Sequence, residues 1–461
     1  MSRLNIKSLF GAQDMTVGKP LTAIIKFSVP LLIGNIAQLL YSTVDSIIVG
    51  RYVGDLALAA VGTASTATNL FLILFMAIGT GITIMVAQYF GAKEYDKLSY
   101  SVGNALTLII FASVFIMAVA TPLTRPILRL ISTPENYFDM AALYCVILFL
   151  GAAGNGFYNI LSGVLRGLGE SVYPLLVLIG TTVLNIILDI VFVAVIKMGV
   201  AGAALATIIC QLLSSAACLW KLVIMKDIVN LHWSSMKIRK FYMGRIISLG
   251  IPSGIQQGVT GIAFMFVQNL INSMGYLVAA CTTAVMRVDA FAILPSFAFN
   301  TAASTFTGQN IGAKKLDRVK SGNRSLLIFG LIVSAVLVAA IILLRRPMLG
   351  LFTETPEVIE MGSRFLCIMA AGYVIIAVSA VLSGTIRGAG DTVAPMWISL
   401  ITNVIIRIPF TYLIAYLTRS DVYPAGNPDT IYIGMLVAFA INSTATFVYY
   451  LKGKWKERAI V

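Results

Sequence analysis

The sequence predicts an all-α polytopic membrane protein, with twelve transmembrane helices arranged as two parallel six-helix repeats. The first observation is composition: 59% of the 461 residues are hydrophobic and only 11% are charged, whereas soluble domains carry about 25% charged residues. The second is the recurrence of apolar windows of about 20 residues, each long enough to cross a ~30 Å hydrocarbon core. The third is an internal repeat with a constant offset along the chain.

Twelve apolar stretches are predicted to be membrane-spanning helices. The first is too long for the apolar region of a signal peptide, and no A-x-A cleavage site follows it, so we expect it to remain as a helix. The stretches are residues 22–49, 57–88, 99–121, 139–161, 172–195, 200–222, 246–273, 278–306, 322–344, 359–383, 393–418 and 431–451.

The distribution of positive charge predicts the orientation of these helices. If both termini are cytoplasmic, most of the basic residues outside the helices fall on the inner side, which is the usual bias of membrane proteins. The net charge of +14 is therefore explained by topology, and we expect no nucleic-acid partner. The predicted inner set includes Arg3, Lys7, Lys93, Lys97, Lys240, Lys314, Lys315 and Arg318.

Two motifs recur at an offset of 221 residues. VAQYFGAKEYDKL (86–98) matches TGQNIGAKKLDRV (307–319), and LSGVLRGLGES (161–171) matches LSGTIRGAGDT (382–392). The chain is thus predicted to consist of residues 1–222 and 246–461, joined by a cytoplasmic linker at 223–245. Parallel repeats of this kind occur in secondary transporters, whose substrate sites lie at the repeat interface. The recurring loops either only hold helix ends together or take part in gating.

Differences between the halves single out polar residues of the first half. In the stretch 22–49, Asn35, Gln38, Ser42 and Asp45 share one helical face, and the matching stretch 246–273 has no acid. Asn185 and Asp189 lie one turn apart in 172–195, where the second half has Asn403 and Arg407. The candidate coupling residues are Asp45, Asn185, Asp189 and Thr207.

Two carboxyl groups in one apolar setting are costly to ionise together, so we expect the pair to hold a proton or a hard cation such as Na⁺. Amide and hydroxyl oxygens would complete a Na⁺ site. The alternative is that Asp45 and Asp189 only hydrogen-bond neighbouring helices.

Further polar residues are candidates for a cavity or substrate site. Asp289 and Arg407 are predicted to pair across helices, either as a structural ion pair or as a substrate contact. The candidates are Gln38, Ser42, Asn155, Asn159, Arg287, Asp289 and Arg407.

The chain resembles the multidrug and toxic compound extrusion (MATE) family from about residue 15 to 450. The resemblance rests on the two six-helix repeats, V-D-x-x-x-V-G at 44–50, V-A-Q-x-x-G-A-K, L-R-G-x-G and the Asn185-x-x-x-Asp189 pair. It implies two six-helix lobes around a large central cavity, and Na⁺ or H⁺ entry coupled to export of cationic or amphipathic compounds. It also implies that Asp45, Asn185, Asp189 and Thr207 form the cation or proton site.

The resemblance further implies a multi-pass protein of a prokaryotic cell membrane, with no bound cofactor and with the bilayer and small molecules as its partners. We expect a monomer. Some members carry a coupling acid in the seventh or tenth helix, and neither 246–273 nor 365–383 contains one.

Two other functions fit the sequence less well. An exporter or flippase of lipid-linked oligosaccharides would need several cationic groups in the cavity, for which Arg287 and Arg407 are the candidates. A membrane-embedded enzyme is disfavoured, because His232 is the one histidine, it falls in the linker, and no common hydrolase or nucleotide-binding motif is present.

Overall fold

The computed structural model describes residues 11–460, and within that range it is built from helices without strands. Residues 1–10 and 461, which include Arg3, Lys7 and the ends of both predicted halves, lie outside the described residues. The helices are α1 (Pro20–Tyr52), α2 (Asp55–Gly91), α3 (Tyr95–Leu130), α4 (Glu135–Leu150), α5 (Ala152–Gly167), α6 (Val172–Asp189), η2 (Ile190–Val195), α7 (Val200–Ile224), α8 (Trp233–Met236), α9 (Lys240–Ser273), α10 (Tyr276–Gly312), α11 (Leu316–Gly350), α12 (Pro356–Gly388), α13 (Val393–Leu400), η3 (Ile401–Ile406), α14 (Arg407–Leu417), α15 (Asp429–Lys452) and η4 (Lys454–Arg458).

Eleven of the twelve predicted stretches each follow one helical rod, and stretch 139–161 follows the bent pair α4 and α5. The predicted all-α fold is confirmed. Within residues 11–460, ten helices are long and apolar enough to span a membrane, or eleven if α4 and α5, bent by 51° at Gly151, count as one span. The remaining rod is α9. Its 34 residues are long enough to cross a membrane. Its polar residues Gln256, Gln257 and Thr260 line a cavity instead of facing lipid.

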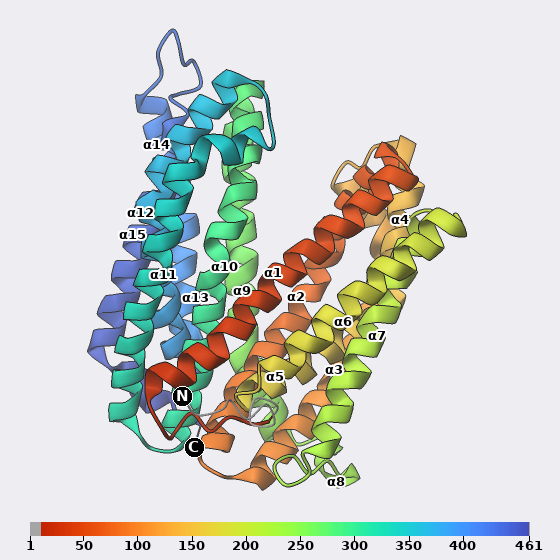
Figure 1. Cartoon of the computed structure of the whole chain (residues 1–461), viewed down its shortest axis with the longest axis vertical. Coiled ribbons are helices and arrows are strands. Elements are labelled where there is room, and N and C mark those ends of the chain that lie inside the picture. Colours follow the sequence, from red (N-terminus) through yellow and green to blue (C-terminus); the bar gives the residue numbers. More distant parts are fainter. Residues whose placement is uncertain (1–10, 461) are drawn as a thin grey trace, which may run out of the picture.

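The two halves form the arms of a V that meet at one end, called the base here (Figure 1). One arm is mainly α1–α7 and the other mainly α9–α15. Two helices connect the arms: α1 packs on α6 of its own half and on α10 and α11 of the other, while α9 packs on α13 and also on α2 and α3. The described ends of the chain lie at the base.

The repeated V-A-Q/T-G-Q motifs close the base by a reciprocal contact. Gln88 Nε2 donates to the carbonyl of Gly388 at 2.9 Å, and Gln309 Nε2 donates to the carbonyl of Gly167 at 3.1 Å. A Cβ on Gly91 would lie 1.9 Å from the carbonyl oxygen of Gln309, and a Cβ on Gly312 would lie 1.9 Å from that of Gln88. The backbones of α2 and α10 thus meet at a distance that only glycine permits.

The chain termini seal the same base symmetrically. The segment before α1 donates from Met15 N to Gln309 Oε1 at 2.9 Å. The segment after α15 donates from Ile460 N to Gln88 Oε1 at 2.7 Å. Each glutamine side chain is fully buried and bonded through both its amide nitrogen and its oxygen, so the closed base leaves neither amide unsatisfied.

The acid of each R-G-x-G-[ED] motif caps the helix that follows it. Glu170 Oε1 accepts from Val172 N and Tyr173 N, both at 3.0 Å, at the start of α6. Asp391 Oδ1 accepts from Ala394 N at 3.2 Å at the start of α13. These bonds satisfy amides that a helix start leaves free, which explains why an acid recurs there.

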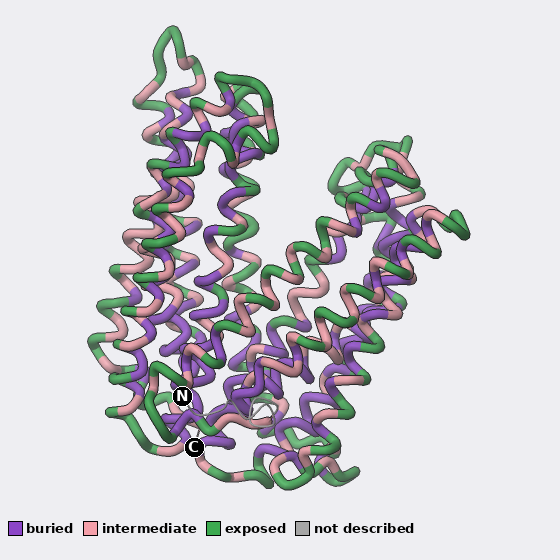
Figure 2. Tube along the Cα trace, in the orientation of Figure 1, coloured by how far each residue is buried: buried purple, intermediate pink, exposed green. Residues whose placement is uncertain are grey.

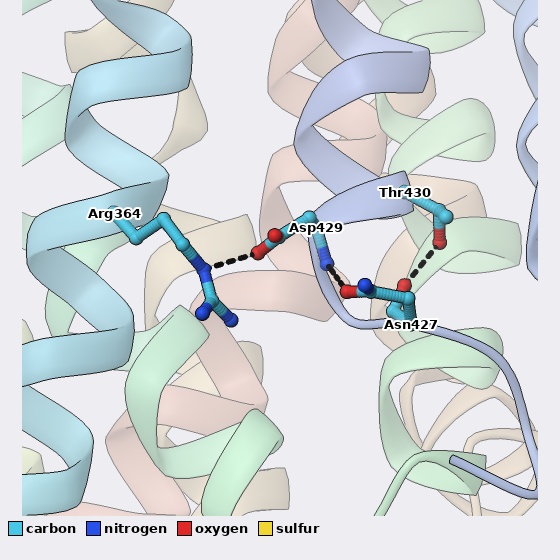
Figure 3. A network of polar contacts seen from close by, with 4 residues as sticks. All are labelled: Arg364, Asn427, Asp429 and Thr430. Carbon is cyan, nitrogen blue, oxygen red and sulfur yellow. Dashed lines mark hydrogen bonds and ion pairs between the residues drawn. The ribbon is translucent and has the colours of Figure 1, made fainter. Parts of the chain in front are cut away.

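Ion pairs join helices at the outer ends of the arms. Arg125 pairs with Asp139 at 2.9 Å, and its repeat equivalent Arg346 pairs with Glu360 at 2.7 Å. In the second arm, Arg364 of α12 also holds Asp429 at the start of α15 at 2.7 Å (Figure 3). The amide of Asp429 donates to Asn427 Oδ1 at 3.0 Å, and Thr430 Oγ1 donates to the Asn427 carbonyl at 2.6 Å. Apart from the partly buried Asp429, the paired side chains are exposed, so these ion pairs contribute little energy.

The arms expose apolar side chains along their length. Figure 2 shows exposed and intermediate residues along the outer helices of both arms. On α3, for example, Phe111, Val114 and Phe115 are each more than half exposed. Such surfaces belong in lipid, where an outward apolar side chain carries no penalty.

Candidate functional site

A central cavity of about 700 Å³ lies between the arms, next to the base. It is lined by α1, α2, α5 and α6 from the first half and by α9, α10, α12, α13, η3 and α15 from the second. Most of these helices contribute the part nearest the base. The substrate site of a transporter with parallel repeats is expected at this interface.

The structure separates the residues that we proposed for the cavity. Gln38 and Asn159 line it. Ser42 is exposed one turn further along α1, outside the lining. Asn155 is also outside the lining, and its Oδ1 accepts a hydrogen bond of 2.9 Å from Asn159 Nδ2. Arg287 is exposed on α10 outside the lining, and Asp289 and Arg407 are buried outside it.

The expected Asp289–Arg407 ion pair is not formed in the described part of the chain. Asp289 accepts a hydrogen bond from the hydroxyl of Tyr373 on α12. Arg407 directs Nη2 to the sulfur of Met435 at 3.0 Å, and its Nε has no partner. The sequence shows that both residues lie in helices of the second half. It does not show which residues of α12 and α15 face them, and the partners come from those two helices.

The structure brings together the four residues predicted for coupling. Asp45 comes from the far half of α1, Asn185 and Asp189 from the end of α6, and Thr207 from α7; none is more than 9% exposed. The carboxyl groups of Asp45 and Asp189 lie close enough to influence each other electrostatically, although no hydrogen bond joins them. This acid cluster, as we name these four residues, lies within the first arm and outside the cavity lining.

Several polar atoms of the acid cluster are unsatisfied. One oxygen of Asp45, both oxygens of Asp189 and both polar atoms of the Asn185 amide have no hydrogen-bond partner within residues 11–460. Buried polar groups without partners are rare in proteins and costly. A proton shared by the acids, or a hard cation bound by these oxygens, would remove that cost.

Two tyrosines border the acid cluster and were missed by the sequence analysis. Tyr41, one turn before Asp45, shares a hydrogen bond of 3.1 Å with Thr207 Oγ1. Tyr144 of α4 lies close enough to interact with both Asp45 and Asp189. The i, i+4 spacing from Asp45 could have identified Tyr41, whereas no sequence pattern connects Tyr144 to the acids.

A π-helical turn adjoins the acid cluster. The helix η2 begins directly after Asp189, and its counterpart η3 contains Asn403 and ends directly before Arg407. Such turns are rare and concentrate at functional sites. In each half the turn adjoins the residue at which the halves differ in charge: η2 follows Asp189 and η3 precedes Arg407.

Oxygen chemistry fits this cluster better than transition-metal chemistry. It offers two carboxyl groups, one amide and one hydroxyl, which suit a proton or a hard monovalent cation. Within residues 11–460, no group of three or more His, Cys, Asp or Glu side chains is arranged to hold a metal ion.

Comparison with known proteins relates the chain to transporters. The MatE family model matches residues 30–191 and 252–413, that is, each half once. A probable multidrug resistance protein, YpnP of Bacillus subtilis, is 31% identical over 447 residues, covering 96% of this chain and 98% of YpnP. The probable multidrug resistance protein NorM of Thermotoga maritima is 25% identical over 449 residues, covering 95% and 94%.

Solved structures share the fold. A transporter of the MOP superfamily from Pyrococcus furiosus has a TM-score of 0.87 at 24% identity, covering 96% of this chain and 97% of its own. The double family match, the full-length relatives and the helical spans agree with the resemblance seen in the motifs. The chain is therefore a member of the multidrug and toxic compound extrusion family of multi-pass membrane transporters.

Proposed function

We propose that this protein is a secondary active exporter, which moves small amphipathic molecules out of the cell in exchange for Na⁺ or H⁺. The observation that carries the proposal is the acid cluster, a buried set of unsatisfied oxygens present in one arm and absent from the repeat-related position of the other. Several full-length relatives are named as multidrug resistance proteins, which supports export of small molecules.

The proposed orientation follows from charge. The base carries the basic loops, including Lys93, Lys97, Lys314 and Lys315, and basic loops favour the cytoplasmic side. The closed base then faces the cytoplasm, both termini are cytoplasmic, and the V opens outward. This arrangement is the outward-open state of an alternating-access cycle.

Coupling requires that the ion and the substrate prefer different states. Seven residues, about 10 Å along a helix, separate Gln38 at the cavity from Asp45 in the acid cluster. Protonation or cation binding at Asp45 and Asp189 can therefore act on the cavity through α1, which also contacts α10 and α11 of the other arm. An equilibrium shifts only by the difference in affinity between its two states, so removal of the acids should uncouple the cycle.

The test is transport in liposomes under an imposed Na⁺ gradient and, separately, a pH gradient. One cationic and one anionic amphipathic dye are used, so that the outcome does not depend on the charge of the substrate. We expect Asp45→Asn and Asp189→Asn to abolish gradient-driven dye movement, while Asp55→Asn, an exposed acid of α2, keeps it. If both cluster variants move dye at the wild-type rate, the coupling role is refuted. If the wild type moves neither dye, the exporter function is refuted.

The gradient that drives movement identifies the ion. Movement under Na⁺ alone would make the cluster a cation site, and movement under pH alone would make it a proton site. The cationic substrates expected from the resemblance are tested by the same pair of dyes.

A further inference from the structure

The central cavity contains two arginines from the recurring L-R-G-x-G motifs. Arg166 lies in the last turn of α5 and Arg387 in the last turn of α12. They are repeat equivalents, because each occupies the R-G-x-G motif at the offset of 221 residues. Both line the cavity near the base, one from each arm.

No acid balances these arginines. Among the described residues that line the cavity, none is Asp or Glu, and neither arginine forms an ion pair within residues 11–460. The other polar lining groups are neutral amides and hydroxyls, such as Asn159, Gln257 and Thr260. A cleft lined by charge of one sign concentrates the opposite sign inside it.

Neutral oxygens hold one guanidinium in place while leaving part of it free. Arg387 donates through Nη1 to Asn300 Oδ1 at 3.4 Å and through Nη2 to Gln256 Oε1. Its Nε is buried without a hydrogen-bond partner. The amides orient the group without neutralising it, and an incoming oxyanion would supply the missing acceptor and the countercharge.

We propose that Arg166 and Arg387 form an oxyanion subsite, which binds the phosphate or carboxylate head of an amphipathic substrate. Guanidinium groups bind such heads through paired N–H donors, and the apolar part of the lining accommodates the tail. This subsite rests on the proposed function, because only an exporter would transport the molecule that binds there. It deepens that function by assigning a negative charge to the head of the substrate. A permanently cationic head would be repelled from both arginines.

The probes differ only in the charge of the head. Hexyl phosphate and hexyltrimethylammonium carry the same short tail, and inorganic phosphate tests the head alone. Dihexanoyl phosphatidic acid tests whether the head is accepted on a lipid. Each is titrated calorimetrically into the full-length protein in nanodiscs made of neutral lipid, without any ion gradient.

We expect hexyl phosphate to bind more tightly than hexyltrimethylammonium. Arg166→Gln and Arg387→Gln should each weaken the phosphate about tenfold, and Arg166→Lys and Arg387→Lys should recover part of that loss. Arg324→Gln, an exposed arginine of α11 outside the cavity, is the matched control and should bind like the wild type. Tighter binding of the ammonium probe, or phosphate binding unchanged in folded Gln variants, would overturn the subsite.

The probes also separate the sources of the head group. Preference for dihexanoyl phosphatidic acid over hexyl phosphate assigns the subsite to lipid-like substrates, and the reverse order assigns it to soluble amphiphiles. Binding is measured at equilibrium in the wild type and without a gradient, so its outcome does not depend on coupled export. Failure of coupled export would therefore leave this result intact, and failure of phosphate binding would leave the coupling proposal intact.

Discussion

At the residue scale, the base depends on two glycines. Gly91 and Gly312 each face the carbonyl of the glutamine in the other repeat, at distances that leave no room for a methyl group. Both glycines have helical neighbours and no unusual φ. Their requirement is close approach of two backbones and not conformational freedom.

Gly91→Ala should destabilise the closed base. Overpacking of this kind costs about 1–3 kcal/mol, and each 1.4 kcal/mol changes the ratio of two states about tenfold. We expect the initial rate of gradient-driven dye movement in liposomes to fall at least several-fold. Gly62→Ala on the same helix is the control, since nothing lies within 4 Å of the added Cβ; equal rates for the two variants would contradict the requirement.

The sequence located the acid cluster but not the charge of the cavity. Duplication made Asp45 and Asp189 conspicuous, because the second half lacks acids at the matching places. Comparison of the halves does not single out Arg166 and Arg387, because both halves carry an arginine at this place in the L-R-G-x-G motif. The helices α5 and α12 continue six and five residues beyond the predicted ends at 161 and 383, and these extensions carry both arginines to the cavity.

At the element scale, helix ends carry much of the repeated sequence. Glu170 and Asp391 cap α6 and α13, which supports the structural interpretation of that loop motif. The glutamine motif, in contrast, closes the base, where a gating role is expected. Apolar pattern gave the position of each rod, but it could not reveal the bend at Gly151 or the π-helical turns, because neither changes the spacing of apolar residues.

Glu170→Ala should lower the stability of the first arm. It removes the acceptor of two backbone N–H groups, which typically costs about 1 kcal/mol. Thermal unfolding in nanodiscs should show a lower midpoint for Glu170→Ala, while Glu170→Gln retains an acceptor and should unfold close to the wild type. A midpoint of Glu170→Ala equal to that of the wild type would exclude the capping role.

The same glutamate should give the fold a small pH dependence. Burial raises the pKa of Glu170 above the usual carboxyl value, so the folded state binds its proton more strongly than the unfolded state does. Stability from this group is therefore present at low pH and is lost as the pH rises from the usual carboxyl pKa through the raised one. Relative to Glu170→Gln, the midpoint of the wild type should fall across that interval; a constant difference between the two would disprove it.

At the scale of the whole molecule, closure of the base and opening of the outer ends are one motion. The arms meet at the base and diverge away from it (Figure 1), and α1 and α9 each contact both arms. Separation of the base contacts should therefore bring the outer ends closer together. This lever geometry is what an alternating-access cycle requires.

Spin labels at Ile131 and Phe352 test that lever. These repeat equivalents follow α3 and α11 at the outer ends and are exposed; Cys367, the exposed cysteine, is first replaced by serine. We expect one long distance in the parent protein and a second, shorter population when Gly91→Ala is added. Gly62→Ala should leave the distribution unchanged, and the absence of a shorter population in Gly91→Ala would argue against a rigid lever.

The reciprocal contact at the base has a consequence for how the two halves associate. Residue Gln88 touches the region of Gly312 while Gln309 touches that of Gly91, which is the pattern of an isologous interface in a two-fold dimer. The linker then only keeps the two halves close together, and the contacting surfaces themselves determine how the halves pair at the base. Residues 1–222 and 223–461, produced as two separate polypeptides in one membrane, should recognise each other through the same surfaces that identical subunits would use.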